Sequence, residues 1–182
     1  MARNIEIKAR LADRARVEAA AAVLADGPAE LIRQDDTFFA CAKGRLKLRE
    51  LSPGRGELIF YQRPDACGPK ASHYDIAATD EPAELRRVLG QALGAAGRVR
   101  KERTLYVIGR TRVHLDRVEG LGDFVELEVV LAEGEAEASG LAEARRLMAA
   151  LGVDEAALIA GAYVDLLTAS PPNTSPNAPS SP

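Results

Sequence analysis

The strongest constraint on the fold is an alternation of charged and apolar residues with a period of two. It recurs in five segments of the chain, at 4–10, 45–49, 101–103, 112–116 and 124–128. Because successive side chains of a strand point to opposite faces, each segment predicts a strand that is charged on one face and apolar on the other. The polar face is almost wholly Lys, Arg and Glu, which favours a charged binding surface over simple solvation.

The remaining patterns predict about eight short strands, with helices after the first, the fifth and the last. We expect strands near 3–11, 30–40, 45–51, 57–63, 72–76, 98–108, 111–118 and 123–131. A helix begins after Asp13, a capping residue, and a second begins at Pro82. Two amphipathic helices, near 135–151 and 154–168, complete the domain.

These elements predict an α+β fold over residues 1–168, followed by a disordered tail at 169–182 that is rich in Pro, Ser and Asn. The sheet can close into an eight-stranded antiparallel barrel with its charged face inside and with helices packed on the apolar outside. An open sheet with its charges facing water is the alternative, and periodicity does not distinguish the two. Tyr163, in the last helix, is either a core residue, which we expect, or a residue that closes one end of a cavity.

Composition excludes several classes of protein. The net charge is -3 with a pI near 5.5, so no overall basicity points to nucleic acid. No segment approaches the roughly 20 apolar residues of a membrane span. The N-terminus resembles no signal peptide, and Cys41 and Cys67 show no metal-binding spacing. We therefore expect a cytoplasmic protein with reduced thiols, for which a homodimer is plausible.

The basic residues of the alternating faces are candidates for anion binding. They are Lys8, Arg10, Arg45, Lys47, Arg49, Arg63, Lys101, Arg103 and Arg112. Like charges about 4 Å apart repel by about 4 kcal/mol at an effective dielectric near 20, so a converging cluster needs carboxylates or a bound polyanion. Arginine binds phosphate oxygens in pairs and lysine acts as a point charge. A polyphosphate is a natural partner, although any single member is equally explained by a solvated strand face.

The acidic residues of the same faces are candidates for metal binding. They are Glu6, Asp116, Glu126 and Glu128. Glu126 and Glu128 lie two residues apart, which places their Cα atoms about 6.5–7 Å apart on one face. Such carboxylates can hold Mg²⁺ or Mn²⁺ together with substrate phosphate oxygens, whereas a solvent-exposed pair is the alternative. His114 shares a face with Arg112 and Asp116, but a single histidine is more commonly a polar filler.

Five motifs together resemble the CYTH superfamily, the triphosphate tunnel metalloenzymes. They are Asn-Ile-Glu-Ile-Lys at 4–8, Arg-Leu-Lys-Leu-Arg-Glu at 45–50, Lys-Glu-Arg at 101–103, Arg-Val-His-Leu-Asp at 112–116 and Gly-Leu-Gly-Asp-Phe-Val-Glu-Leu-Glu at 120–128. The resemblance extends from residue 3 to about 167, and the stretch 101–128 is most similar to the class IV adenylyl cyclase branch.

The resemblance implies an eight-stranded tunnel that holds a triphosphate, with Mg²⁺ or Mn²⁺ as cofactor. The implied metal ligands are Glu6, Glu126 and Glu128. The implied phosphate-binding residues are Lys8, Lys47, Arg49, Lys101, Arg103 and Arg112. Alternation, rather than a motif, adds Arg63, Arg45 and Arg10 to the lumen, together with Asp116 as the candidate catalytic base.

One position departs from the family pattern. The first motif usually reads Glu-x-Glu-x-Lys, and here Asn4 takes the place of the first Glu and brings no negative charge.

The leading hypothesis is a cyclase that converts ATP to cyclic AMP and pyrophosphate. A triphosphatase acting on thiamine triphosphate, a nucleoside triphosphate or inorganic triphosphate is the second. A non-catalytic polyphosphate-binding module is the third, and Asn4 is the feature that supports it.

Overall fold

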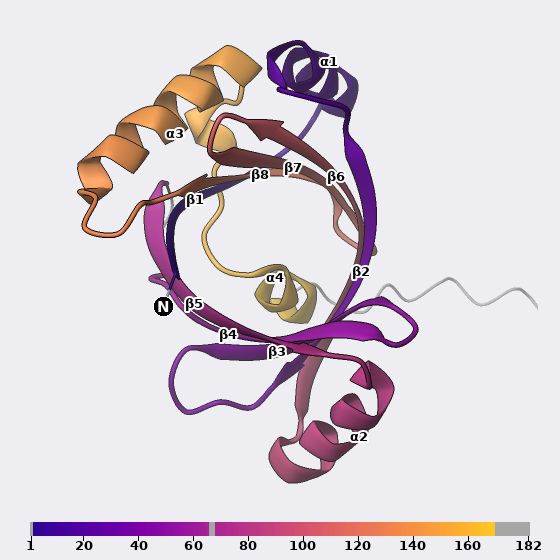
Figure 1. Ribbon diagram of the computed structural model, residues 1–182. Coiled ribbons are helices and arrows are strands. Elements are labelled where there is room, and N and C mark those ends of the chain that lie inside the picture. The colour runs from indigo at the N-terminus through magenta and orange to yellow at the C-terminus, as the bar shows by residue number, and fades with distance from the viewer. Residues whose placement is uncertain (1, 66–67, 170–182) are drawn as a thin grey trace, which may run out of the picture.

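The computed structural model describes residues 2–65 and 68–169, and its centre is a closed barrel of eight antiparallel strands (Figure 1). Around the barrel the order is β1-β5-β4-β3-β2-β6-β7-β8. The strands are β1 (Ala2–Arg10), β2 (Glu30–Phe39), β3 (Arg45–Ser52), β4 (Arg55–Gln62), β5 (Lys70–Thr79), β6 (Ala95–Ile108), β7 (Thr111–Val118) and β8 (Gly122–Val130). The prediction of a closed barrel is confirmed, and the open-sheet alternative is wrong.

Three longer helices lie outside the ring of strands in Figure 1, as predicted. They are α1 (Arg14–Leu24), α2 (Pro82–Leu93) and α3 (Glu137–Leu151). The Asp13 carboxylate accepts a hydrogen bond from the Arg16 backbone N–H at 3.1 Å, which satisfies one of the free donors at the start of α1. Pro82 begins α2, where its missing N–H costs no helical hydrogen bond.

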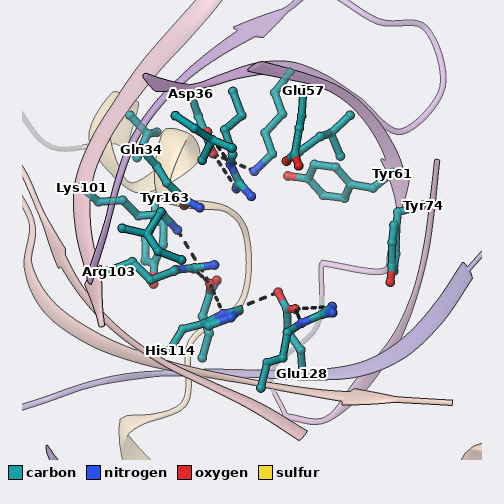
Figure 2. Close-up of a pocket in the computed structure, with 18 of the residues that line it drawn as sticks. Gln34, Asp36, Glu57, Tyr61, Tyr74, Lys101, Arg103, His114, Glu128 and Tyr163 are labelled. Atoms are coloured by element: carbon teal, nitrogen blue, oxygen red, sulfur yellow. Dashed lines mark hydrogen bonds and ion pairs between the residues drawn. The ribbon is translucent and has the colours of Figure 1, made fainter. Parts of the chain in front are cut away.

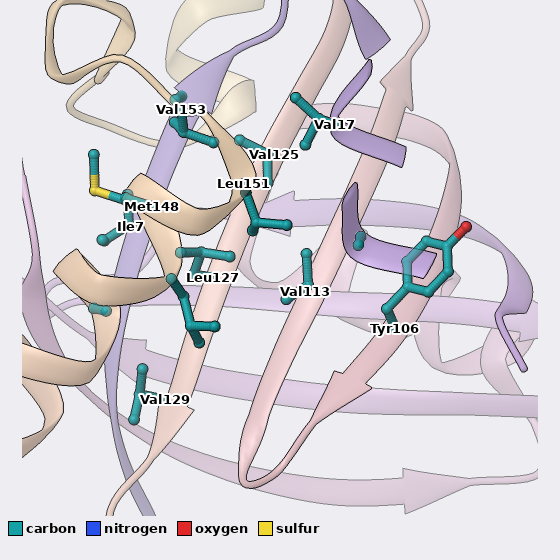
Figure 3. Packing of buried hydrophobic residues seen from close by; sticks show 14 of the residues in the cluster. Ile7, Val17, Tyr106, Val113, Val125, Leu127, Val129, Met148, Leu151 and Val153 are labelled. Atoms are coloured by element: carbon teal, nitrogen blue, oxygen red, sulfur yellow. The ribbon is translucent and has the colours of Figure 1, made fainter. Parts of the chain in front are cut away.

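The larger hydrophobic core lies between the barrel wall and the helices α1 and α3 (Figure 3). It is built from the outward-facing residues of neighbouring strands, such as Ile7 of β1, Val113 of β7 and Leu127 of β8, each at most 1% exposed. Val17 of α1 and Leu151 of α3 pack against them. Because these side chains turn outward, the residues between them in sequence turn into the lumen.

A second core lies inside one end of the barrel, and it corrects the prediction for the last helix. The segment predicted as one helix over 154–168 forms instead a short 3₁₀ turn, η1 (Glu155–Ala157), an extended stretch and α4 (Tyr163–Ala169). Gly161, with φ +77°, interrupts the helix. In Figure 1, α4 lies within the ring, where its first turn packs on inward-facing apolar residues, among them Phe38 and Phe124.

Close contacts hold α4 in this position. A Cβ at Gly97 of β6 would lie only 2.4 Å from Val164 Cγ2, so glycine is what permits the close approach. The Arg63 guanidinium donates to the Gly161 carbonyl at 2.7 Å, and Arg45 donates to Asp165 at 2.7 Å. Tyr163 is buried in this core, as predicted, and its ring also lines the cavity described below. The end of the barrel next to α4 is therefore filled.

The structure describes only part of the predicted tail and one of the two cysteines. Ala169 is the last residue of α4, while the rest of the predicted tail, 170–182, lies outside the described residues, as does Cys67. Cys41 is exposed and carries a free thiol. Within the described ranges, every helix is too short or too polar to cross a membrane.

Candidate functional site

The lumen of the barrel contains a cavity of about 570 Å³, a size typical of small-molecule sites (Figure 2). Nine of its lining residues are Lys or Arg and six are Asp or Glu, so the lining is net positive although the chain is net negative. All the phosphate-binding and metal-binding residues that the family motifs implied line it, and so does Arg63; they are Lys8, Lys47, Arg49, Arg63, Lys101, Arg103, Arg112, Glu6, Glu126 and Glu128. Residues far apart in sequence thus converge as the alternation predicted.

One charged cluster lies on β2 and β3 around Asp36. The Lys47 ammonium donates to its carboxylate at 2.7 Å, and the Arg49 guanidinium donates at 2.9 Å and 3.0 Å. Burial raises the pKa of Asp36, but the charges of Arg49 and Lys47 outweigh it and hold that pKa well below its usual range. Burial, followed by the charge of Arg49, lowers the pKa of Lys47 to about 8.

A second cluster surrounds Asp116 of β7, which is 0% exposed and is not among the residues that line the cavity. Its carboxylate accepts hydrogen bonds from Lys101 at 2.8 Å, from Arg103 at 2.6 Å and 2.7 Å, and from the Tyr163 hydroxyl at 3.0 Å. Burial raises the pKa of Asp116, but Arg103 and Lys101 hold it well below the usual range. Asp116 is therefore an ionised anchor for two cavity-lining cations.

Glu126 of β8 lies close to three cationic side chains, those of Lys8, Lys101 and Arg103. Lys8 lies 2.7 Å from it, and Arg103 donates to it through a close contact. The Lys8 ammonium also lies 4.1 Å from the centre of the Tyr163 ring. Burial raises the pKa of Glu126, but Lys8, Lys101 and Arg103 hold it well below its usual range, so Glu126 is charged at neutral pH.

Glu128 lies two residues further along β8, paired with Arg112 at 2.8 Å and with the His114 ring 3.7 Å away (Figure 2). Burial raises the pKa of Glu128, but His114 and Arg112 lower it to about 2. Burial, followed by the charge of Arg103, lowers the pKa of His114 to about 4, so its ring is neutral at pH 7. Glu6, opposite Glu128 in the register, accepts instead from Arg63 at 3.1 Å.

A group of side chains in the described part of the chain fits a cation. The ligand atoms of His114, Glu126 and Glu128 all lie within 4.8 Å of one another. His114 Nδ1 is buried, and no described group forms a hydrogen bond with it. Two ionised carboxylates with an unpartnered imidazole nitrogen are suitable donors for a divalent ion. The group differs from the predicted set because it contains His114 in place of Glu6.

The mouth of the cavity, away from α4, combines apolar residues with exposed charged ones, namely Glu30, Arg33 and Arg55. Leu31 of β2 and Ile76 of β5 line it and are 67% and 52% exposed, and Ile32 and Leu51 add to the same surface. Exposure falls toward α4: the side chain of Arg112 is 37% exposed, that of Glu128 is 19% exposed, and that of Lys8 is 3% exposed. The cavity therefore passes from a mouth with apolar and charged residues, past the candidate cation group, to a basic closed end.

The residues predicted from alternation alone separate into two groups. Arg63 lines the cavity, whereas Arg10 is exposed and lies against the Phe124 ring at 4.9 Å. Arg45 pairs with Asp65 and Asp165 beside α4.

The lining also contains residues that the sequence analysis did not select, among them Gln34, Asp36, Glu57, Tyr61 and Tyr74. Asp36 follows Asp35 directly, and only the alternation of Gln34, Asp36 and Phe38 would have indicated which of the two turns inward.

A closed eight-stranded antiparallel barrel with basic residues and a carboxylate pair in its lumen defines a recognisable class of protein. The family model for the CYTH domain matches residues 2–163, and the chain belongs to the CYTH family.

Among curated proteins, an adenylate cyclase, CyaB, of Aeromonas hydrophila is 30% identical over 138 residues, which cover 70% of this chain and 69% of that protein. A structure from Pyrococcus horikoshii OT3 is similar with a TM-score of 0.77 at 22% identity, covering 90% of this chain and 98% of that one. The putative adenylyl cyclase HpAC1 from Hippeastrum has a TM-score of 0.55 at 18% identity, covering 87% and 90%. The two structural likenesses concern the fold.

Proposed function

We propose that this protein is a metal-dependent enzyme that acts on an organic triphosphate, with the conversion of ATP to cyclic AMP and pyrophosphate as its reaction. The observation that carries this proposal is the order of chemical groups along the cavity. The apolar side chains at the mouth, such as Ile32, Leu51 and Ile76, give a base a surface to pack on, and the basic closed end suits a polyphosphate chain. Similarity to a curated adenylate cyclase at 30% identity supports the same conclusion.

The position of the candidate cation group favours reaction at the α-phosphorus. Glu128 and Arg112 are more exposed than Lys8 and Lys101, so they lie nearer the mouth. With the sugar at the mouth and the terminal phosphates against α4, the phosphate nearest this group is the one attached to the sugar. Held by Glu126 and Glu128, a Mg²⁺ or Mn²⁺ ion would supply Lewis-acid polarisation of that phosphate.

The basic residues have two tasks in the reaction. Lys8, Lys47, Arg49, Lys101 and Arg103 bind the phosphate chain and stabilise the charge that develops on the leaving pyrophosphate. The ribose 3′-oxygen forms a bond to the α-phosphorus as the bond from that phosphorus to the bridging oxygen breaks. The proton of the hydroxyl group leaves to a base.

We assign Asp116 a positioning role in place of the predicted catalytic base. Its carboxylate lies behind the cavity wall, and Lys101, Arg103 and Tyr163 occupy its oxygen atoms. A carboxylate with a pKa well below its usual range is a poor proton acceptor near neutral pH. Its contribution is to hold two phosphate-binding cations in fixed directions.

A triphosphatase is the second candidate. The same basic residues would direct water to the terminal phosphorus at the closed end, and orthophosphate would leave. The Hippeastrum protein, which is described as having a dominant triphosphatase activity, is similar to this chain in fold. The apolar residues at the mouth argue against inorganic triphosphate as the preferred substrate, because that molecule has no group to pack on them.

The test is to incubate the purified protein with ATP, thiamine triphosphate and inorganic triphosphate in turn, with Mg²⁺ or Mn²⁺, and to separate the products by ion-exchange chromatography. We expect cyclic AMP and pyrophosphate from ATP, and loss of this activity in Glu128→Gln. Glu102→Gln, on the outer face of β6, is the matched control and should retain it. Orthophosphate release would instead establish the triphosphatase, and binding without any product would establish the non-catalytic module.

A further inference from the structure

The proposed reaction uses the candidate cation group but gives His114 no role of its own. It lies on the inward face of β7 with Glu126 as its Cα partner on β8, and Glu128 is two residues further along that strand. Its Nδ1 atom lies 4.0 Å from Glu126 Oε2 and 3.7 Å from Glu128 Oε1. Both distances are too long for a hydrogen bond, so the ring points at the two carboxylates without bonding to either.

The unpartnered nitrogen requires an explanation. His114 is 4% exposed, and none of the described groups forms a hydrogen bond with Nδ1. A buried polar atom without a partner is unfavourable and is uncommon in folded proteins. Arg103 and Arg112 already donate to Glu126 and Glu128, so both carboxylates have other positively charged partners and do not need a protonated imidazole.

The spacing is close to that of ligands around one ion. Ligand atoms at about 2.1 Å from a metal, at angles of about 90–110°, lie roughly 3–3.5 Å apart. The two distances from His114 Nδ1 exceed this range by a few tenths of an ångström, which small side-chain rotations can remove. Phosphate binding would assist, because the phosphate oxygens would compete with Glu126 for the Arg103 guanidinium and free that carboxylate for the cation.

We propose that His114 Nδ1 is the third protein ligand of the divalent cation held by Glu126 and Glu128, and that the site therefore prefers Mn²⁺ or another first-row transition ion over Mg²⁺. Imidazole binds transition ions well, whereas Mg²⁺ takes oxygen ligands almost exclusively. The proposal rests on the proposed function only in that the cation is the one used with the triphosphate.

The chain offers a direct spectroscopic test because it contains only two histidines. Untagged protein is loaded with Mn²⁺, with and without inorganic triphosphate, and pulsed electron paramagnetic resonance is used to detect ¹⁴N coupling from a coordinated imidazole. We expect coupling in the wild type and in His73→Gln, whose altered side chain lies on the outward face of β5. We expect no coupling in His114→Gln, with Mn²⁺ affinity lower by about tenfold or more.

Competition measures the preference between ions. The Mg²⁺ concentration that displaces half of the bound Mn²⁺ should fall in His114→Asp, which replaces nitrogen with an oxygen donor. Bound Mn²⁺ without ¹⁴N coupling in the wild type, or coupling that persists in His114→Gln, would overturn the proposal, as would no Mn²⁺ binding in either condition. Calorimetry with inorganic triphosphate in the absence of metal tests the proposed function separately. It measures the affinity for the phosphate chain, which depends on the Lys and Arg residues and not on His114.

Discussion

Replacing Gly97 with alanine should displace α4 from the barrel. The added Cβ would lie 2.4 Å from Val164 Cγ2, whereas carbon atoms pack at about 3.5–4.0 Å, so the helix must retreat by roughly 1 Å. Overpacking of this kind costs about 1–3 kcal/mol of unfolding free energy. Val164→Ala alone removes two buried methylene equivalents, worth about 1.6 kcal/mol.

The double variant distinguishes packing from general damage. The new methyl group at position 97 should enter the space that the valine leaves, so the combined loss should be smaller than the sum of the single losses by about 1 kcal/mol or more. Urea unfolding of the four proteins measures this coupling. Gly90→Ala in α2, where a Cβ meets nothing within 4 Å, is the control and should gain up to about 1 kcal/mol. Additive losses, or a Gly97→Ala variant as stable as the wild type, would show that α4 does not pack on β6.

Three further predictions follow from the charged clusters. Because burial lowers the pKa of Lys47 to about 8, the affinity for inorganic triphosphate, measured by calorimetry, should fall as the pH rises past about 8. Lys47→Arg should remove this fall. A pH profile of Lys47→Arg equal to that of the wild type would contradict the assignment. Asp116→Asn should cost about 3 kcal/mol in urea unfolding, because it removes one of the two carboxylates that neutralise the buried Lys101 and Arg103 and leaves them Glu126 alone. A loss below about 1 kcal/mol would exclude that role. The pKa of Glu128 is about 2 in the folded protein and 4.5 in the unfolded chain. Ionised Glu128 should therefore add on the order of 3 kcal/mol to the free energy of unfolding above pH 4.5, and this contribution should disappear as the pH falls toward 2. Urea midpoints across this range should show a shallower decline in Glu128→Gln than in the wild type.

The alternation of charged and apolar residues predicted most of the barrel. Lys47, Arg49, Glu126 and Glu128 were placed in the lumen because a strand has only two faces, and the structure places them there. Alternation does not report how far along the barrel each residue lies. Arg10 therefore fits the inward phase but lies beyond the cavity, against Phe124.

Two features depended on tertiary contacts that local patterns do not contain. Asp36 neutralises Lys47 and Arg49 only because β2 pairs with β3 in a register that places Asp36 opposite Arg49. The predicted helix at 154–168 was wrong because helical periodicity does not reveal which apolar surface a helix will cover. Gly161 was the one local sign of a break.

The filled end of the barrel has a consequence for the order in which molecules leave. Since α4 blocks passage at its end, a substrate that enters through the mouth must leave its products through the same opening. In the proposed cyclase the nucleotide product lies nearer that opening, so it departs first, and pyrophosphate departs last from a basic dead end. Added pyrophosphate should therefore compete with ATP for the free enzyme, while cyclic AMP should not. Catalytic turnover would then be limited by how quickly the barrel releases an anion that it is built to retain.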